Sequence, residues 1–199
     1  MTMRLRTINT WLLVFIILIN GYVITAPLIP AVLYHWQSHT GVRQQLTTAL
    51  RPKTKPSTIP PGPKTNHLII PSMLLNGEVF EGPVSQQYKT LKKGLWRWPA
   101  SSTPDKGGNT VIMGHRFTYT NPRGVLYYLN KVKTGDEIGL LWNNKQYIYK
   151  VSSVREVPPT EVSIEDSTTD ARLTIFTCTP LWVPKNRLVI VAELEGQQP

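Results

Sequence analysis

The chain has 199 residues and a formal net charge of +10. This length suits one globular domain of roughly 100 to 150 residues with attached segments. The first 66 residues carry seven Lys or Arg and no acidic residue, whereas residues 67–199 carry 15 basic against 12 acidic side chains, a net charge of +3. The positive charge thus lies mostly outside the expected domain, which argues against a nucleic-acid-binding surface.

The N-terminal segment predicts a membrane anchor. Arg4 and Arg6 precede the apolar run WLLVFIILI, and the predicted span covers residues 8–26. About 20 apolar residues are needed to cross the hydrocarbon core of a bilayer. The basic flank, residues 1–7, is expected to stay in the cytoplasm and the rest of the chain to lie outside it.

A cleaved signal peptide is the alternative interpretation of the same segment. Cleavage after Ala26 would place Ile24 at the −3 position and Pro27 directly after the cut. Signal peptidase sites favour small residues at −3, so this is a poor processing site. We therefore favour a retained anchor.

Residues 27–66 predict a linker outside the membrane. The stretch PLIPAVLYHW is rich in aromatics and prolines, which suit the headgroup boundary better than a continued helix. Residues 41–50 are compatible with a short helix. Residues 51–66 contain five prolines and four cations, a composition typical of a stiff, extended tether.

Residues 67–199 predict an all-β domain, because short apolar runs alternate with turn signals and sustained helical periodicity is scarce. Many short strands at regular spacing favour a barrel or a sandwich. The expected strands are HLIIPSMLL, NTVIMGH, DEIGLLW, KQYIYKVSSVREV, RLTIFTC and RLVIVAEL. The expected turns or connections are GEVFEG, LKKGLWRWP, DKGGN, NPRG, KTG and WNNK.

The single cysteine, Cys178, lies at the end of the expected strand RLTIFTC. One cysteine excludes an intrachain disulfide and a multi-cysteine zinc site. A nucleophilic thiol needs a neighbouring imidazole or cation to raise its thiolate fraction, and a group that stabilises the oxyanion. We therefore look for a histidine and an arginine at the ends of other expected strands, where they could lie near Cys178.

Two such residues stand out. His115 closes the expected strand NTVIMGH, whereas His35, His39 and His67 lie in or next to the linker. Arg187 opens the last expected strand, nine residues after the cysteine. If these two strands pair antiparallel, Cys178 and Arg187 face each other at one rim of the sheet.

Each residue also has an ordinary structural interpretation. A lone cysteine is commonly a small buried hydrophobe, a histidine after a strand is commonly a turn residue, and an arginine opening a strand is commonly a solvated charge. Together, in a domain outside the cytoplasm, the three favour a cysteine nucleophile.

The sequence resembles the sortase family over about residues 67–195. TIFTC (residues 174–178) resembles the family's TLxTC signature, and TPLWVPKNRLVIVAEL the segment in which an arginine opens the last strand. GNTVIMGHRF resembles the segment carrying the family's histidine. HLIIPSMLLNGEVFEG resembles the first strands, and KVKTGDEIGLLWNNKQYIYKV the central hairpin. The order of the motifs, His then Cys then Arg, and the N-terminal anchor also match.

This resemblance implies a closed eight-stranded β-barrel with short helices in residues 67–199. It implies a cysteine transpeptidase that cuts surface proteins at an LPxTG-like sorting signal between Thr and Gly, and joins them to an amine of a cell-wall precursor or pilin. By motif, Cys178 would be the nucleophile, His115 the acid for the leaving amine, and Arg187 the oxyanion stabiliser. No cofactor or metal is expected.

The resemblance also suggests residues that contact the substrate. Thr177 would help to shape the site, while Trp182 and Pro184 would either line a peptide groove or stiffen a surface loop. Glu161, Glu165 and Asp166 lie in the loop EVSIED, which is either a calcium-responsive segment or a solvated acidic turn.

Two other functions remain open from sequence. A peptidoglycan-hydrolysing cysteine peptidase is disfavoured because such folds place Cys before His in the chain. A membrane-tethered β-barrel binding module, with Cys178 as packing, would differ from both enzymes in having an unreactive thiol.

Overall fold

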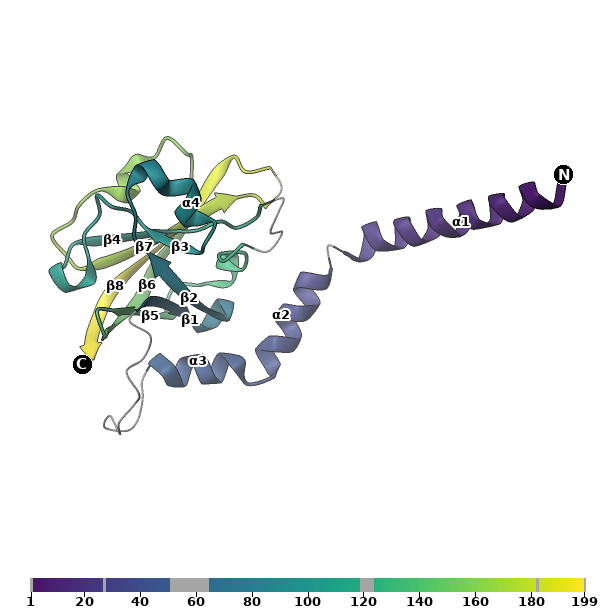
Figure 1. The fold of residues 1–199 in the computed structure, drawn as a ribbon. Helices are drawn as coiled ribbons and strands as arrows, with labels where there is room; N and C mark the ends of the chain where they lie inside the picture. Colours follow the sequence, from purple (N-terminus) through teal and green to yellow (C-terminus); the bar gives the residue numbers. More distant parts are fainter. Residues whose placement is uncertain (1, 27, 51–64, 119–123, 182, 199) are drawn as a thin grey trace. The chain divides into compact units, whose positions relative to one another are not determined.

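The computed structural model describes residues 2–26, 28–50, 65–118, 124–181 and 183–198. They form two compact units, Met1–Val42 and Arg43–Pro199. The first unit contains α1 (Thr2–Thr25) and α2 (Ile29–His39) (Figure 1). Within α1, the 20 residues Arg6–Thr25 have a mean hydropathy of 1.9, so this helix is long and apolar enough to cross a membrane.

Helix α2 corrects one expectation from the sequence, because the stretch PLIPAVLYHW was not expected to be helical. Pro30 falls in the first turn of α2, where its missing N–H has no helical partner to lose. Pro30 therefore marks the start of a second helix. Leu28, Val32 and Trp36 are exposed and lie at helical spacing.

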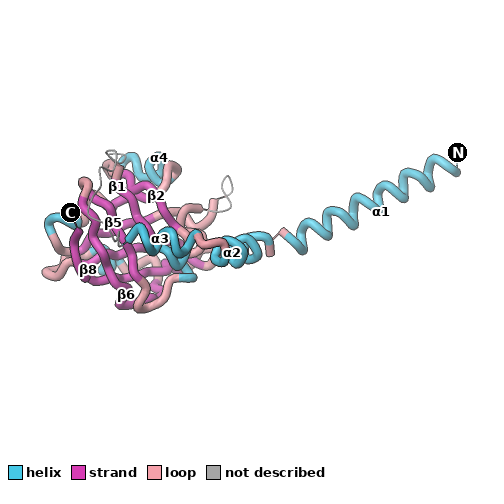
Figure 2. Tube along the Cα trace, turned by 90° about the horizontal axis from the view of Figure 1, so that it is seen from below, coloured by secondary structure: helices cyan, strands magenta, loops and turns pink. Residues whose placement is uncertain are grey.

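The second unit begins with α3 (Val42–Leu50), which agrees with the short helix expected there. Leu50 is fully buried. The Gln146 side chain donates from Nε2 to the carbonyl oxygens of Ala49 (3.1 Å) and Leu50 (3.3 Å), so α3 lies against the barrel wall (Figure 2). Most of the proline-rich tether, residues 51–64, lies outside the described residues.

Eight strands form a closed barrel in the order β1-β2-β3-β4-β7-β8-β6-β5 (Figure 1), which confirms the expected architecture. The pairs β2–β3 and β4–β7 are parallel, and the other pairs are antiparallel. Short helices, including α4 (Gln87–Leu91), connect some of the strands. The strands are β1 (Asn66–Ile70), β2 (Leu75–Phe80), β3 (Leu95–Arg97), β4 (Asn109–Met113), β5 (Glu137–Trp142), β6 (Lys145–Val157), β7 (Arg172–Thr179) and β8 (Asn186–Gln198).

The two-residue turn between β5 and β6 explains why this hairpin was predicted from the sequence. Asn143 and Asn144 join β5 to β6, and both have positive φ, 50° and 62°. A two-residue turn with two left-handed residues matches the twist of the flanking strands, and asparagine tolerates this conformation. The motif WNNK therefore fixes the register of the β5–β6 pair.

Three expected segments differ from the structure. HLIIPSMLL is not one strand, because Pro71–Met73 forms a 3-10 helix and Leu74 has a φ of 59°, which separates β1 from β2. GEVFEG, expected as a turn, contains the second half of β2, and LKKGLWRWP contains β3. Strand β3 has only three residues, too few to show an alternating pattern.

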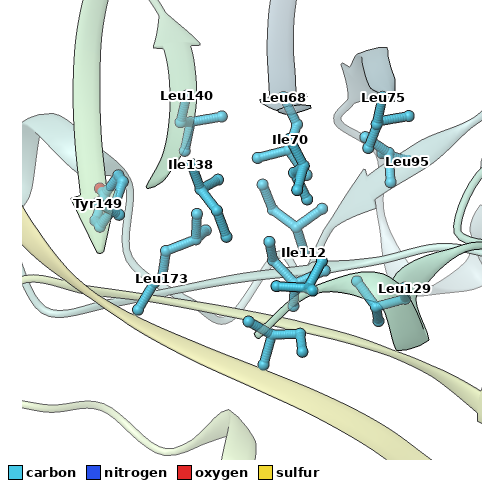
Figure 3. Packing of buried hydrophobic residues seen from close by; sticks show 14 of the residues in the cluster. Leu68, Ile70, Leu75, Leu95, Ile112, Leu129, Ile138, Leu140, Tyr149 and Leu173 are labelled. Carbon is cyan, nitrogen blue, oxygen red and sulfur yellow. The ribbon is translucent and has the colours of Figure 1, made fainter. Parts of the chain in front are cut away.

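The barrel interior is the main hydrophobic core, in which side chains from most strands converge (Figure 3). The residues labelled in Figure 3 are Leu68, Ile70, Leu75, Leu95, Ile112, Leu129, Ile138, Leu140, Tyr149 and Leu173. A second, smaller cluster contains Val111, Val157, Ile164, Phe176 and Val189. Residues of β7 alternate between the two clusters, with Leu173 and Ile175 in the first and Phe176 in the second, so the smaller cluster lies on the outer face of the barrel.

Candidate active site

The sequence-predicted residues Cys178 and Arg187 are direct partners across the antiparallel pair β7–β8. The carbonyl oxygen of Thr179 accepts a hydrogen bond from the N–H of Lys185 (2.9 Å), which closes the connecting loop. Residues opposite each other in such a pair have Cβ atoms about 4.5–5.5 Å apart. The structure therefore brings the thiol and the guanidinium to one rim, as the sequence predicted.

His115 reaches the same rim through the parallel pair β4–β7. Met113 of β4 is the partner of Phe176 of β7, and continuing this register by two residues sets His115 beside Cys178. The Thr177 hydroxyl donates to the carbonyl oxygen of Gly114 (2.8 Å). The segments that continue β4 and β7 therefore remain adjacent beyond the last ladder pair. Neighbouring strands lie about 4.8 Å apart, so this register predicts that the side chains of His115 and Cys178 lie near each other.

The alternation of β7 decides which side chains are accessible. Cys178 is exposed and carries a free thiol on the outer face. Thr177 points to the other side and is only 2% exposed. Thr177 therefore supports the site from beneath by holding the segment that carries His115, and its predicted role in substrate binding stays a prediction.

Two contacts fix the position of Arg187. Its guanidinium lies over the Phe176 ring, with Cζ 5.0 Å from the ring centroid. Its Nη1 donates to Oε1 of Glu165 at 3.1 Å, and both side chains of this ion pair are mostly buried, with exposed fractions of 24% and 20%. Partial burial makes this ion pair less sensitive to solvent screening than a surface pair.

His115 is half-buried and lines a cavity of about 420 Å³. The lining of this cavity also includes Tyr88, Lys92, Thr118 and Val125. Burial lowers the pKa of His115 below its ordinary value of 6.5, because desolvation disfavours the charged imidazolium. At neutral pH the imidazole is therefore mainly neutral and able to take up a proton.

This lowered pKa predicts a pH dependence of stability. The folded state binds the His115 proton at lower pH than the unfolded state, so the stabilisation is present above about pH 6.5 and is lost as the pH falls through the folded-state pKa. The denaturation midpoint of the full chain in detergent micelles should therefore fall less steeply between pH 7 and pH 5 in His115→Gln than in the unmodified protein. Parallel curves for the two proteins would contradict this.

The segment after His115 returns to it. The N–H of Gly124 donates to the carbonyl oxygen of Arg116 (3.1 Å), and the N–H of Leu126 donates to that of His115 (3.0 Å). A Cβ atom on Gly124 would collide with the carbonyl oxygen and carbon of His115. Only glycine permits this close approach, so Gly124 sets the position of the histidine backbone.

Arg116 forms a second tie between the two strand ends. It is only 9% exposed, and its Nη1 donates to the Thr179 hydroxyl at 2.8 Å. The Thr179 hydroxyl also donates to Oε1 of Glu156 (3.4 Å). Burial lowers the pKa of Arg116, and the negative charge of Glu156 opposes this shift. Arg116, the residue after His115, is thus hydrogen-bonded to Thr179, the residue after Cys178.

Sequence reasoning missed these supporting roles. The sequence gives Arg116 no role, and it places Glu165 in a loop that is either a solvated acidic turn or a calcium-responsive segment. The one available signal was their position directly beside predicted site residues or in a neighbouring loop. Gly124 carried the ordinary signal of a turn residue in NPRG.

The other predicted contacts are only partly visible. Pro184 is exposed in the β7–β8 loop, and Trp182 lies outside the described residues. Within the part of the chain that the structure describes, no group of three or more His, Cys, Asp or Glu side chains could hold a metal ion. Of the acidic loop, Glu165 contacts Arg187 and Glu161 contacts the Ser163 hydroxyl.

Comparison with known proteins agrees with this geometry. The family model described as the sortase domain matches residues 68–195. Sortase A of Listeria monocytogenes is 33% identical over 129 residues, covering 64% of this chain and 55% of that protein. Sortase SrtE1 of Streptomyces coelicolor is 29% identical over 162 residues, covering 74% of this chain and 45% of that protein.

Solved structures of both proteins share the fold. The crystal structure of L. monocytogenes sortase A superposes with a TM-score of 0.58 at 29% identity, covering 68% of this chain and 90% of that one. The structure of S. coelicolor sortase E1 with a tripeptide in its active site gives a TM-score of 0.59 at 27% identity, covering 70% and 92%.

The closed barrel with a thiol, an imidazole and a guanidinium on adjacent strand ends defines a cysteine-centred site on a sortase fold. The match to the family model covers more than half of the chain, and the chain belongs to the sortase family. It spans about half the length of the two relatives named above.

Proposed function

We propose that the protein is a cysteine transpeptidase that cleaves LPxTG-like sorting signals between Thr and Gly. The observation that carries the proposal is the register of three adjacent strands: Cys178 pairs with Arg187 across β7–β8, and the β4–β7 register continued by two residues would bring His115 beside Cys178. Membership of the sortase family and the likeness to sortase E1 with a bound tripeptide support a peptide substrate.

The proposed reaction has two acyl-transfer steps. The Cys178 thiolate attacks the carbonyl carbon of the threonine residue, and the Arg187 guanidinium stabilises the negative charge on the tetrahedral oxygen. His115, having accepted the thiol proton, donates it to the leaving amine as the C–N bond breaks. An incoming amine then attacks the thioester, and the thiol is released.

The acceptor in this proposal is an amine of a cell-wall precursor or a pilin. The donor is a surface protein that carries a sorting signal. A thioester retains enough reactivity to acylate an amine without a further energy source. The cavity lined by His115 offers space next to the histidine, which suits a site that must accommodate both a leaving and an incoming amine.

The proposed topology anchors the enzyme through α1, with residues 1–7 in the cytoplasm and the barrel outside. The stretch of residues 7–42 contains no Lys, Arg, Asp or Glu. Such a stretch suits a bilayer and its boundary, and Arg4 and Arg6 suit the cytoplasmic side. The exposed apolar residues of α2 suit the headgroup region.

The test is intact-protein mass spectrometry of the full chain in detergent micelles, incubated with a library of LPxTG-like peptides with and without an added amine. A mass gain equal to the acyl half of a peptide, discharged by the amine, is expected. Cys178 is the only cysteine, so protein alkylated with iodoacetamide is a clean control and should give no adduct. An absent adduct, with a thiol that alkylates only after unfolding, would favour a binding module instead.

A further inference from the structure

We propose that Glu165 is a positioning residue, which holds the Arg187 guanidinium in the orientation required at the thiol. The proposal rests on the transpeptidase function stated above. It assigns a role to an acidic side chain in the loop between β6 and β7, a segment that the sequence alone left as either an acidic turn or a calcium-responsive loop.

The contact between the two side chains is direct. Arg187 donates from Nη1 to Glu165 Oε1 at 3.1 Å, and four-fifths of the Glu165 side chain is buried. A free arginine samples many rotamers, and ordering it at the moment of reaction would cost entropy. A carboxylate in a fixed place limits this sampling before the substrate arrives.

The loop that carries Glu165 is itself anchored. Asn109, which is 3% exposed, donates from Nδ2 to the carbonyl oxygens of Ile164 (3.1 Å) and Asp166 (2.9 Å). Its Oδ1 accepts a hydrogen bond from the Thr174 hydroxyl (2.8 Å). The residues on both sides of Glu165 are therefore tied to one buried amide of β4.

This anchor connects the strands of the site to the loop. Asn109 opens β4, the strand that leads to His115, and Thr174 lies four residues before Cys178 on β7. Ile164 adds an apolar contact, because it packs in the outer cluster with Phe176. The carboxylate of Glu165 is thus fixed relative to both strands that carry the chemistry.

The geometry favours positioning over competition with the substrate. Among the described residues, the Arg187 guanidinium makes its hydrogen bond through Nη1 alone, and an arginine has five N–H donors. The Phe176 ring supports one face of the guanidinium. The donors on Nε and Nη2 are then available to a tetrahedral oxygen while Glu165 holds Nη1.

The test compares Glu165→Ala and Glu165→Gln with Asp166→Asn. The control removes the same charge one residue away, from an exposed side chain, and keeps the backbone carbonyl that Asn109 binds. The rate constant for thioester formation at saturating peptide should fall by about tenfold in Glu165→Ala. It should fall less in Glu165→Gln, which keeps an amide oxygen, and stay unchanged in the control.

The apparent KM should change less than the rate constant, because the tetrahedral oxygen carries more charge than the ground-state carbonyl. If Glu165 had only a structural role, Glu165→Ala would lower the melting temperature, and the rate constant would not change more than the apparent KM. An unchanged rate constant in Glu165→Ala would overturn the proposal. A faster reaction would do the same, since it would show that Glu165 competes with the substrate.

A second readout is independent of peptide cleavage. The guanidinium N–H signals of Arg187, assigned by their loss in Arg187→Lys, should sharpen or exchange faster in Glu165→Ala than in the unmodified protein or in Asp166→Asn. If the unmodified protein forms no thioester but this difference is seen, the transpeptidase proposal fails and the positioning contact stands. If thioester forms and the signals are the same in all variants, the positioning proposal fails.

Discussion

Arg187→Lys is expected to slow thioester formation by about 10²- to 10³-fold, the usual cost of losing one preorganised oxyanion donor. Lysine keeps the positive charge, but its ammonium is a compact, strongly hydrated group without the planar fork of arginine. It cannot keep the Glu165 contact, the stacking on Phe176 and a donor for the tetrahedral oxygen at the same time. Rapid-quench mass spectrometry of the acyl-enzyme measures the rate constant.

The matched control is Arg172→Lys at the other end of the strand pair. Arg172 opens β7 and forms an exposed ion pair with Asp170 at 3.0 Å, far along the strand from the thiol. Surface pairs of this kind contribute little, so this variant should acylate at the unmodified rate. If Arg187→Lys acylated within about threefold of the unmodified rate, a positive charge alone would suffice at this position.

Gly124→Ala is expected to cost about 1–3 kcal/mol of unfolding free energy, the usual penalty of overpacking. It should also lower the acylation rate by about 10²-fold, since small displacements of a catalytic group have effects of this size. The added methyl group meets the His115 carbonyl group and the carbonyl carbon of Arg116, so the histidine segment has to move. Chemical denaturation in detergent micelles and the acyl-enzyme assay report the two effects separately.

Gly196→Ala on β8 provides the comparison for this change. A Cβ atom at Gly196 meets no heavy atom within 4 Å, so the same substitution should be tolerated there. If Gly124→Ala matched Gly196→Ala in both stability and rate, the close approach of the returning segment would not determine where His115 lies.

Most of the strands were predictable because they follow local rules, whereas the choice of a closed barrel over a sandwich rested on the family resemblance. The expected strand NTVIMGH contains β4, and the structure buries four of the five residues of β4. Cys178 and Arg187 are nine residues apart on one hairpin, so their pairing followed from local register. Strand β3 was missed because three residues carry no period, and β2 because its second half, GEVF, contains glycine and glutamate.

The support of the site was not predictable in the same way. Arg116 and Thr179 are 63 positions apart, and Asn109 binds a carbonyl 55 positions away. No periodicity or turn signal marks such pairs, because they form only when the parallel pair β4–β7 is in register. The prediction that His115 lies near Cys178 likewise depended on the family resemblance and on the order of the motifs.

The β7–β8 hairpin consists of a paired ladder and a connecting loop. Cys178 and Arg187 are held by their own ladder, and the residues between them leave the sheet after Thr179 and re-enter it at Asn186. The connecting loop can therefore change in sequence without altering the spacing of nucleophile and guanidinium. Under the proposed function, exchange of this loop with that of a relative is expected to change which peptides are bound, while the ladder that pairs Cys178 with Arg187 stays intact.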